Sequence, residues 1–294
     1  MKTVTDNLQE TADEINGMLQ TLLLNHSSLY QRNDHNGPVV IISAHGDYAY
    51  RELQEAGRQI QAKLLEEYRR FNSLLKTLLR EQPEDVLNQL SEAETVMLRT
   101  IEQQHTWCKT TQEAFARATE SLQTQITLLK NLYDPSTGDI FYVPDTNALL
   151  YNPALERWEF DGVPSFALVL TPTILSEVDA LKINHRNETV RQKAETLINQ
   201  IKEFRRRGRL TEGVTLVKGK STILAIAVEP NMQDSLPWLD STNNDDRFLA
   251  AVIEIMRLRP RSVVLAVSRD INFQNKAEFA RVPFVEPPES ITAP

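Results

Sequence analysis

The stretch Ile140-Phe-Tyr-Val-Pro-Asp-Thr-Asn-Ala-Leu-Leu150 decides how the second half of the chain folds. Its first four residues are apolar and rich in β-formers, so they predict a short buried strand that stops at Pro144. Asp145 then stands at the carboxyl end of that strand, and Ala148 begins a helix. Ligands in open α/β sheets bind just outside the carboxyl ends of the strands. Asp145 is therefore either the N-cap of the helix or a ligand for a cation at the mouth of the sheet.

Downstream of this stretch, strand-like apolar runs alternate with helix-like segments. This pattern is typical of a parallel sheet with crossover helices, so it predicts an α/β domain over residues 140–290. The expected strands lie at 140–143, 166–170, 262–267 and 282–285, the expected helices at 173–182, 188–207, 247–258 and 272–280, and a hairpin at 214–228.

Residues 1–135 are expected to form a separate α-helical domain, either a bundle or a hairpin of long helices. Apolar residues recur at steps of three and four in residues 8–29 and again in residues 49–78. The second of these helices is expected to begin at an N-cap, Asp47. Before it, the run 39–43 is β-like, and it is either a short strand or a buried lead-in to the helix.

A further helix is expected from Pro83 to about Leu132, with His105 and Cys108 on it as flank and seam residues. Apolar side chains in this helix recur every seven residues, at Ile101, Cys108, Phe115, Leu122 and Leu129. This is the spacing of a coiled-coil seam. It favours a partner helix and predicts self-association through residues 47–132.

The composition fits a folded cytoplasmic protein. Of 294 residues, 41% are hydrophobic and 24% are charged, so the chain can bury a substantial core. Cys108 is the single cysteine, which excludes a disulfide within the chain and fits a reducing compartment. No apolar run approaches the ~18 residues of a membrane span, and the start of the chain lacks the apolar core of a signal peptide. We therefore expect a cytoplasmic protein with no membrane partner.

Most of the negative charge lies in the first half of the chain. Residues 1–139 carry 13 basic and 20 acidic side chains, whereas residues 140–294 carry 19 basic and 20 acidic ones. If cations neutralise some carboxylates of the second half, its surface is locally basic. The net charge of −8 therefore does not exclude a nucleic-acid substrate.

Further carboxylates are expected at the same edge of the sheet as Asp145. Each is placed there by a preceding strand or by a helix start, and they are Glu177, Asp245, Asp246 and Asp270. Neighbouring carboxylates repel one another unless cations lie between them, and hard oxygen ligands suit Mg²⁺ or Mn²⁺. Two such ions can activate a water and stabilise the leaving oxygen of a phosphodiester. Helix caps and surface ion pairs are the alternatives for each residue, but the shared edge favours a metal site.

Four motifs of this half resemble those of the PIN domain, the metal-dependent nuclease fold of many bacterial toxin ribonucleases and of eukaryotic RNA-decay endonucleases. The motifs are Val143-Pro-Asp-Thr-Asn147, Thr171-Pro-Thr-Ile-Leu-Ser-Glu-Val-Asp-Ala-Leu-Lys182, Asn243-Asn-Asp-Asp-Arg-Phe-Leu-Ala-Ala251 and Val267-Ser-Arg-Asp-Ile-Asn-Phe-Gln-Asn-Lys-Ala277. The resemblance covers residues 140–286 and leaves the helical half outside. The last motif and the long insertion at about 209–241 are similar to the larger PIN domains.

The resemblance implies a set of catalytic residues that ligate Mg²⁺ or Mn²⁺, namely Asp145, Glu177, Asp246 and Asp270, with Asp245 as an adjacent candidate ligand. Thr146 is placed like the hydroxyl that orients the first aspartate. Asn147 and Asn272 are expected to support the site.

The resemblance also implies an endoribonuclease, in which a metal-activated water attacks the phosphodiester and leaves a 3′-hydroxyl and a 5′-phosphate. Several basic side chains are candidates for nucleic-acid binding, with a solvated helix face as the alternative, and they are Lys182, Arg186, Arg191, Arg205, Arg206, Arg207, Arg209, Arg247 and Lys276. Two other functions stay open, a DNA or flap-type nuclease and a non-catalytic PIN scaffold that acts as an interaction module. The expected partners are RNA or single-stranded DNA, a second copy of the chain through its helical region, and a regulatory protein.

Overall fold

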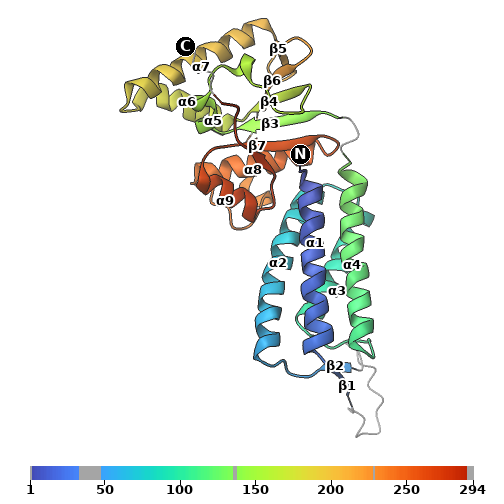
Figure 1. The fold of residues 1–294 in the computed structure, drawn as a ribbon. Coiled ribbons are helices and arrows are strands. Elements are labelled where there is room, and N and C mark those ends of the chain that lie inside the picture. Colours follow the sequence, from blue (N-terminus) through green and yellow to red (C-terminus); the bar gives the residue numbers. More distant parts are fainter. Residues whose placement is uncertain (1, 33–47, 135–137, 228, 290–294) are drawn as a thin grey trace. The chain divides into compact units, whose positions relative to one another are not determined.

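A computed structural model of the protein describes residues 2–32, 48–134, 138–227 and 229–289 (Figure 1). The chain divides into two compact units, a helical one spanning Thr5–Leu132 and an α/β one made of Met1–Val4 and Tyr133–Pro294. Within the described residues, no helix combines the length and the apolar character needed to cross a membrane.

Long α-helices make up most of the described part of the helical unit. They are α1 (Val4–Gln20), α2 (Glu55–Leu79), α3 (Glu84–Ile101) and α4 (Thr111–Leu132), and a π-helical turn, η1 (Thr21–His26), continues α1. Two short strands, β1 (Leu29–Gln31) and β2 (Tyr48–Tyr50), pair antiparallel. The expected apolar positions of the first helix are all buried, namely Leu8, Ala12, Ile15, Leu19, Leu22 and Leu23. This confirms the helical spacing read from the sequence.

The second long helix begins later than the sequence pattern predicts. α2 starts at Glu55, because residues 48–50 pair with residues 29–31 and so cannot join the helix. Asp47 and the β-like run 39–43 lie outside the described residues.

The continuous helix expected after residue 83 is interrupted between Ile101 and Thr111. His105 and Cys108 therefore lie in a connection and not on a helix. Gln103 turns the chain there with a positive φ of 54°, a conformation that a regular helix does not contain.

This interruption also breaks the seven-residue seam. On α4 the buried apolar positions follow steps of three and four, at Ala114, Ala118, Leu122, Ile126 and Leu129, whereas Phe115 is half-buried. α3 and α4 pack against each other and against α2 within one chain. The heptad argument for a partner helix therefore does not hold, and self-association stays a prediction.

The α/β unit is built on a six-stranded sheet whose strand order is β5-β6-β4-β3-β7-β8. Its strands are β3 (Ile140–Pro144), β4 (Phe166–Leu170), β5 (Val214–Val217), β6 (Ser221–Ala225), β7 (Val263–Val267) and β8 (Phe284–Val285). All neighbouring strands are parallel except β5 and β6, which form an antiparallel hairpin. The helices beside the sheet are α5 (Thr146–Tyr151), α6 (Pro172–Asn184), α7 (Glu188–Arg207), α8 (Asn244–Leu258) and α9 (Ile271–Phe279). The predicted parallel sheet with helices is confirmed.

The two central strands bring their carboxyl ends together. β3 lies between β4 and β7 and pairs in register with β7, so that Pro144 is opposite Val267. Asp145 N donates to Val267 O at 2.9 Å just beyond this pair. The residues that follow β3, β4 and β7 are therefore gathered at one edge of the sheet, where the acidic side chains were expected.

Candidate functional site

Asp145 lies at the centre of this edge and is nearly buried, with 7% of its surface exposed. It caps α5, and its Oδ1 accepts a hydrogen bond from Ala148 N at 2.6 Å. Its Oδ2 accepts a hydrogen bond from the Ser268 hydroxyl. Burial raises the pKa of Asp145 to about 6, and the negative charges of Asp270 and Asp245 add to this rise. The carboxylate is therefore firmly held in a place where its charge is unfavourable.

The start of α8 places a second acidic pair at the same edge. Asp246 is buried, and its Oδ1 accepts a hydrogen bond from Lys276 Nζ at 2.6 Å while its Oδ2 accepts one from Asp240 N at 2.9 Å. Asp245 is half-buried, and its Oδ2 lies 3.8 Å from the same lysine nitrogen. Burial raises the pKa of Asp245, the Lys276 ammonium opposes that rise, and the charges of Asp270 and Asp246 add to it.

Asp270 completes this group from the end of β7. It caps α9, and its Oδ1 accepts hydrogen bonds from Asn272 N at 2.8 Å and Phe273 N at 3.3 Å. Its own backbone N–H donates to Ser268 Oγ at 3.0 Å. Ser268 therefore links the carboxylate of Asp145 to the backbone of Asp270 through one hydroxyl.

Residues 142–286 match the family model of the PIN domain. This region is a PIN domain. No curated protein matches the chain. The match begins inside β3 and ends just after β8, so it contains all of the six-stranded sheet except the first two residues of β3, and every acidic residue described above. PIN domains are generally nucleases, although some are not catalytic, so the match gives this edge of the sheet a nuclease-like setting.

The hydroxyl groups that bond the acidic residues of the PIN domain are not the ones expected from the sequence. The Thr146 hydroxyl was expected to orient Asp145, but it donates to Glu177 of α6. Ser268 takes the role at Asp145. The sequence did contain a signal for Ser268, because it directly follows the strand that ends at Val267.

Glu229 is a charged residue of this site that sequence reasoning missed. The Arg247 guanidinium contacts both of its carboxylate oxygens, and the Thr173 hydroxyl donates to its Oε1 at 2.9 Å. These contacts hold the pKa of Glu229 below its usual range, with the hydrogen bond from Arg247 as the largest cause. Arg247 also lies close enough to Glu177 for that charge to raise the pKa of the guanidinium. Glu229 lies in the insertion between the second and third motifs, where no pattern marks it.

The expected supporting asparagines contribute less than their positions suggested. Asn272 meets Asp270 through its backbone N–H. The Asn147 side chain is exposed and makes no hydrogen bond with the described residues.

The basic candidates separate into different surroundings. Lys276 and Arg247 lie among the carboxylates, whereas Lys182 in the last turn of α6 and Arg186 beyond it make no ion pair within the described chain. Four others are held by acceptors elsewhere, namely Arg191 by Glu188 and His185 O, Arg206 by Glu203, Arg207 by Glu156 and Arg209 by Glu212. Arg205 faces a separate cavity.

The donors at this edge suit a hard divalent cation in their chemistry. They are carboxylate oxygens, and burial and mutual repulsion raise the pKa values of Asp145 and Asp245. Among the described residues, however, no group of three Asp, Glu, His or Cys side chains has the geometry to hold a metal ion. The ammonium of Lys276 lies against Asp246 and near Asp245, so it already supplies part of the positive charge. The single compact cluster of carboxylates expected from the sequence is therefore not preformed.

Proposed function

We propose that the PIN domain is a Mg²⁺- or Mn²⁺-dependent endoribonuclease. The observation that carries the proposal is the group formed by Asp145, Asp245 and Asp270 at the carboxyl edge of the sheet. Burial raises the pKa values of the first two, and the charge of the third adds to both. A cation between these residues would relieve the repulsion that raises those pKa values.

Five carboxylates would hold the metal in this proposal, namely Asp145, Glu177, Asp245, Asp246 and Asp270. When bound, such an ion supplies positive charge to a phosphate oxygen and lowers the pKa of a water molecule. The chain's own contribution is to hold the ligands. Ser268 and Ala148 fix both oxygens of Asp145, and Thr146 fixes Glu177.

Lys276 has a further role in the proposal. Its ammonium stabilises Asp246 in the absence of metal. We propose that it contacts a phosphate of the substrate once a cation is bound. Moving this ammonium from the carboxylate to the phosphate would release an oxygen of Asp246 for the cation. Arg247 is held by Glu229 at the same edge and is the second cation within reach of the substrate.

The substrate class is tested by incubating the full chain with Mn²⁺ and end-labelled single-stranded RNA, single-stranded DNA or a DNA flap of the same sequence. The proposal expects RNA to be cut internally and the products to carry 5′-phosphate and 3′-hydroxyl ends. Preferential cutting of the DNA or the flap would replace the ribonuclease with a DNA nuclease. Absence of cutting in all three would favour a non-catalytic scaffold, in which Lys276 permanently supplies the cation.

A further inference from the structure

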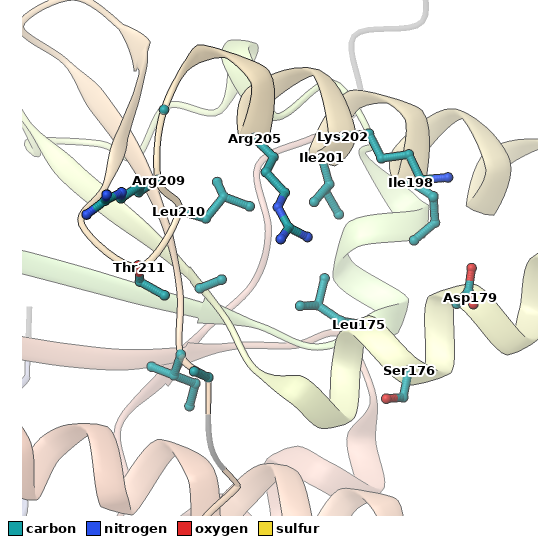
Figure 2. A pocket seen from close by; sticks show the side chains of 14 residues that line it. Leu175, Ser176, Asp179, Ile198, Ile201, Lys202, Arg205, Arg209, Leu210 and Thr211 are labelled. Carbon is teal, nitrogen blue, oxygen red and sulfur yellow. The ribbon is translucent and has the colours of Figure 1, made fainter.

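A cavity of about 660 Å³ lies between α6, α7 and the end of β6 (Figure 2). Its walls are largely aliphatic, with Leu175, Ile198, Ile201, Leu210 and Ile226 facing the space. The volume is within the range of about 300–1,000 Å³ that is typical of small-ligand sites. The cavity can therefore hold a mostly apolar group of small-ligand size.

Two cations of α7 line this cavity, Lys202 and Arg205, and Figure 2 shows the Arg205 side chain reaching toward the aliphatic wall. Neither makes a hydrogen bond or an ion pair with the part of the chain that the structure describes. The neighbouring Arg206 and Arg207 are different, because each has a carboxylate partner on the protein. A third cation of the lining, Arg209, is held by Glu212, so Lys202 and Arg205 are the lining cations left available for an anion.

The opposite wall, α6, supplies a hydroxyl and a carboxylate, which can accept hydrogen bonds from a ligand. Ser176 and Asp179 line the cavity there, and both are exposed. Asp179 accepts no hydrogen bond and forms no ion pair within the described residues. A ligand that fills the cavity therefore meets an acceptor on one side and cations on the other.

The same helix connects the cavity to the carboxylate site. Glu177 is adjacent in sequence to Ser176, and the two residues point about 100° apart on α6. The small residues Ser176 and Ala180 form an exposed ridge between the two places, so an extended chain can cross there closely. On the other side, residues 225–227 line the cavity at the carboxyl end of β6, and Glu229 beyond them bonds Thr173 and Arg247.

We propose that this cavity binds the base of a nucleotide that neighbours the scissile phosphate, while Lys202 and Arg205 bind the phosphate backbone of the same strand. A base has an apolar body for the aliphatic wall and ring N–H or amino donors for Asp179, and its phosphate matches the two cations. An acidic peptide would match the cations and the wall, but it would leave the closeness to the carboxylates unused. This inference rests on the proposed ribonuclease function and assigns that enzyme a contact beyond its reacting atoms.

The test measures the affinity of labelled single-stranded RNA for the full chain by fluorescence anisotropy, with Asp145→Asn in every protein to prevent cleavage. We expect the double variant Lys202→Ala/Arg205→Ala to lower the affinity by about tenfold or more and to reduce the salt dependence by about two phosphate contacts. Leu175→Trp fills the cavity without changing the charge, and we expect it to weaken binding too. Lys193→Ala is the matched control on the same helix, and we expect it to leave the affinity within about twofold, because Lys193 is an exposed cation of α7 without an ion pair in the described chain and does not line the cavity.

Unchanged RNA affinity in the double variant and in Leu175→Trp would overturn the proposal and leave the cavity to a peptide. An equal loss in Lys193→Ala would overturn it as well, because general charge and not the cavity would then bind RNA. Both cavity residues of the double variant are exposed, so its folding does not depend on the aliphatic wall. Cleavage by proteins that retain Asp145 is measured in parallel. Cleavage with cavity-independent binding rejects this inference alone, whereas cavity-dependent binding without cleavage rejects the ribonuclease function alone.

Discussion

The charged form of Asp145 is needed to bind a metal ion, but it is unfavourable in the folded protein without metal. Burial and neighbouring carboxylates raise its pKa to about 6, so the folded metal-free protein binds a proton there more tightly than the unfolded chain does. The stability that this proton contributes is fully present below about pH 4, the unfolded value, and is lost as the pH rises through about 6. At neutral pH the charged carboxylate therefore destabilises the metal-free fold.

Asp145→Asn should remove this penalty. In EDTA we expect the variant to gain about 2 kcal/mol in the free energy of unfolding at neutral pH, and to gain little near pH 4, where the wild-type residue is already protonated. Urea unfolding at the two pH values measures the difference. A variant that is less stable than the wild type at neutral pH would show that Asp145 serves the fold as a charged cap.

In the absence of metal, the positive charge of Lys276 should reduce the repulsion between the carboxylates of the site. Lys276→Met leaves the buried Asp246 without its cation, so we expect a loss of about 3 kcal/mol in the absence of metal. Saturating Mn²⁺ should restore more stability to this variant than to the wild type, because the metal then supplies the missing charge. Thermal unfolding with Mn²⁺ and with EDTA checks both effects.

Lys193→Met is the control for this measurement, because Lys193 is exposed on α7 and has no ion pair within the described chain. It should leave both melting temperatures nearly unchanged. If Mn²⁺ raises the melting temperature of Lys276→Met less than that of the wild type, the Lys276 ammonium does not replace the charge of the metal in the metal-free protein.

The places of the acidic residues on their elements could be predicted from the sequence, since a residue that closely follows a buried strand or begins a helix is positioned by that element; their role as metal ligands stays a prediction. Asp145, Asp245 and Asp270 are of this kind. The hydroxyl partners were harder to assign, because Thr146 can turn toward either of two carboxylates and local spacing does not decide which. Glu229 could not be predicted, because its contact with Arg247 depends on how an insertion without a periodic pattern folds back.

At the scale of elements, apolar spacing located the helices but not their ends. The interruption between α3 and α4 contains no glycine or proline, and the residue that turns the chain with a positive φ is Gln103. The seven-residue spacing from Ile101 through Cys108 to Phe115 runs across this interruption. The seven-residue spacing therefore suggested one continuous coiled-coil seam where the structure has two helices and a connection between them.

Leu122 and Phe115 test which interpretation of α4 is correct. Leu122 is buried with 4% exposure, whereas Phe115 is half-buried. We expect Leu122→Ala to lower the stability of the helical unit by about 3 kcal/mol, and Phe115→Ala to cost clearly less although it removes a larger side chain. Urea unfolding at low and high protein concentration measures both costs. Equal costs together with a strong dependence on concentration would restore the intermolecular seam.

At the scale of the whole molecule, the two compact units should respond differently to metal. Calorimetry of the full chain should show two unfolding transitions if the units unfold independently. Mn²⁺ should raise the melting temperature of the transition that belongs to the PIN domain. At a hundredfold excess of Mn²⁺ over its dissociation constant, the free energy of unfolding of this domain should increase by about 2.7 kcal/mol. A Mn²⁺ shift of the helical transition, with the other unmoved, would place the metal outside the PIN domain.

The central claim is that the carboxylates at the edge of the PIN sheet hold a metal that cleaves RNA. The most direct measurement is the rate at which the full chain cuts end-labelled RNA in Mn²⁺, compared with EDTA and with Asp145→Asn. Asp161→Asn is the matched control, because Asp161 is an exposed aspartate in a turn. We expect cleavage by the wild type and by Asp161→Asn in Mn²⁺, no cleavage in EDTA, and a rate lower by orders of magnitude in Asp145→Asn. Cleavage that persists in EDTA or in Asp145→Asn would contradict it.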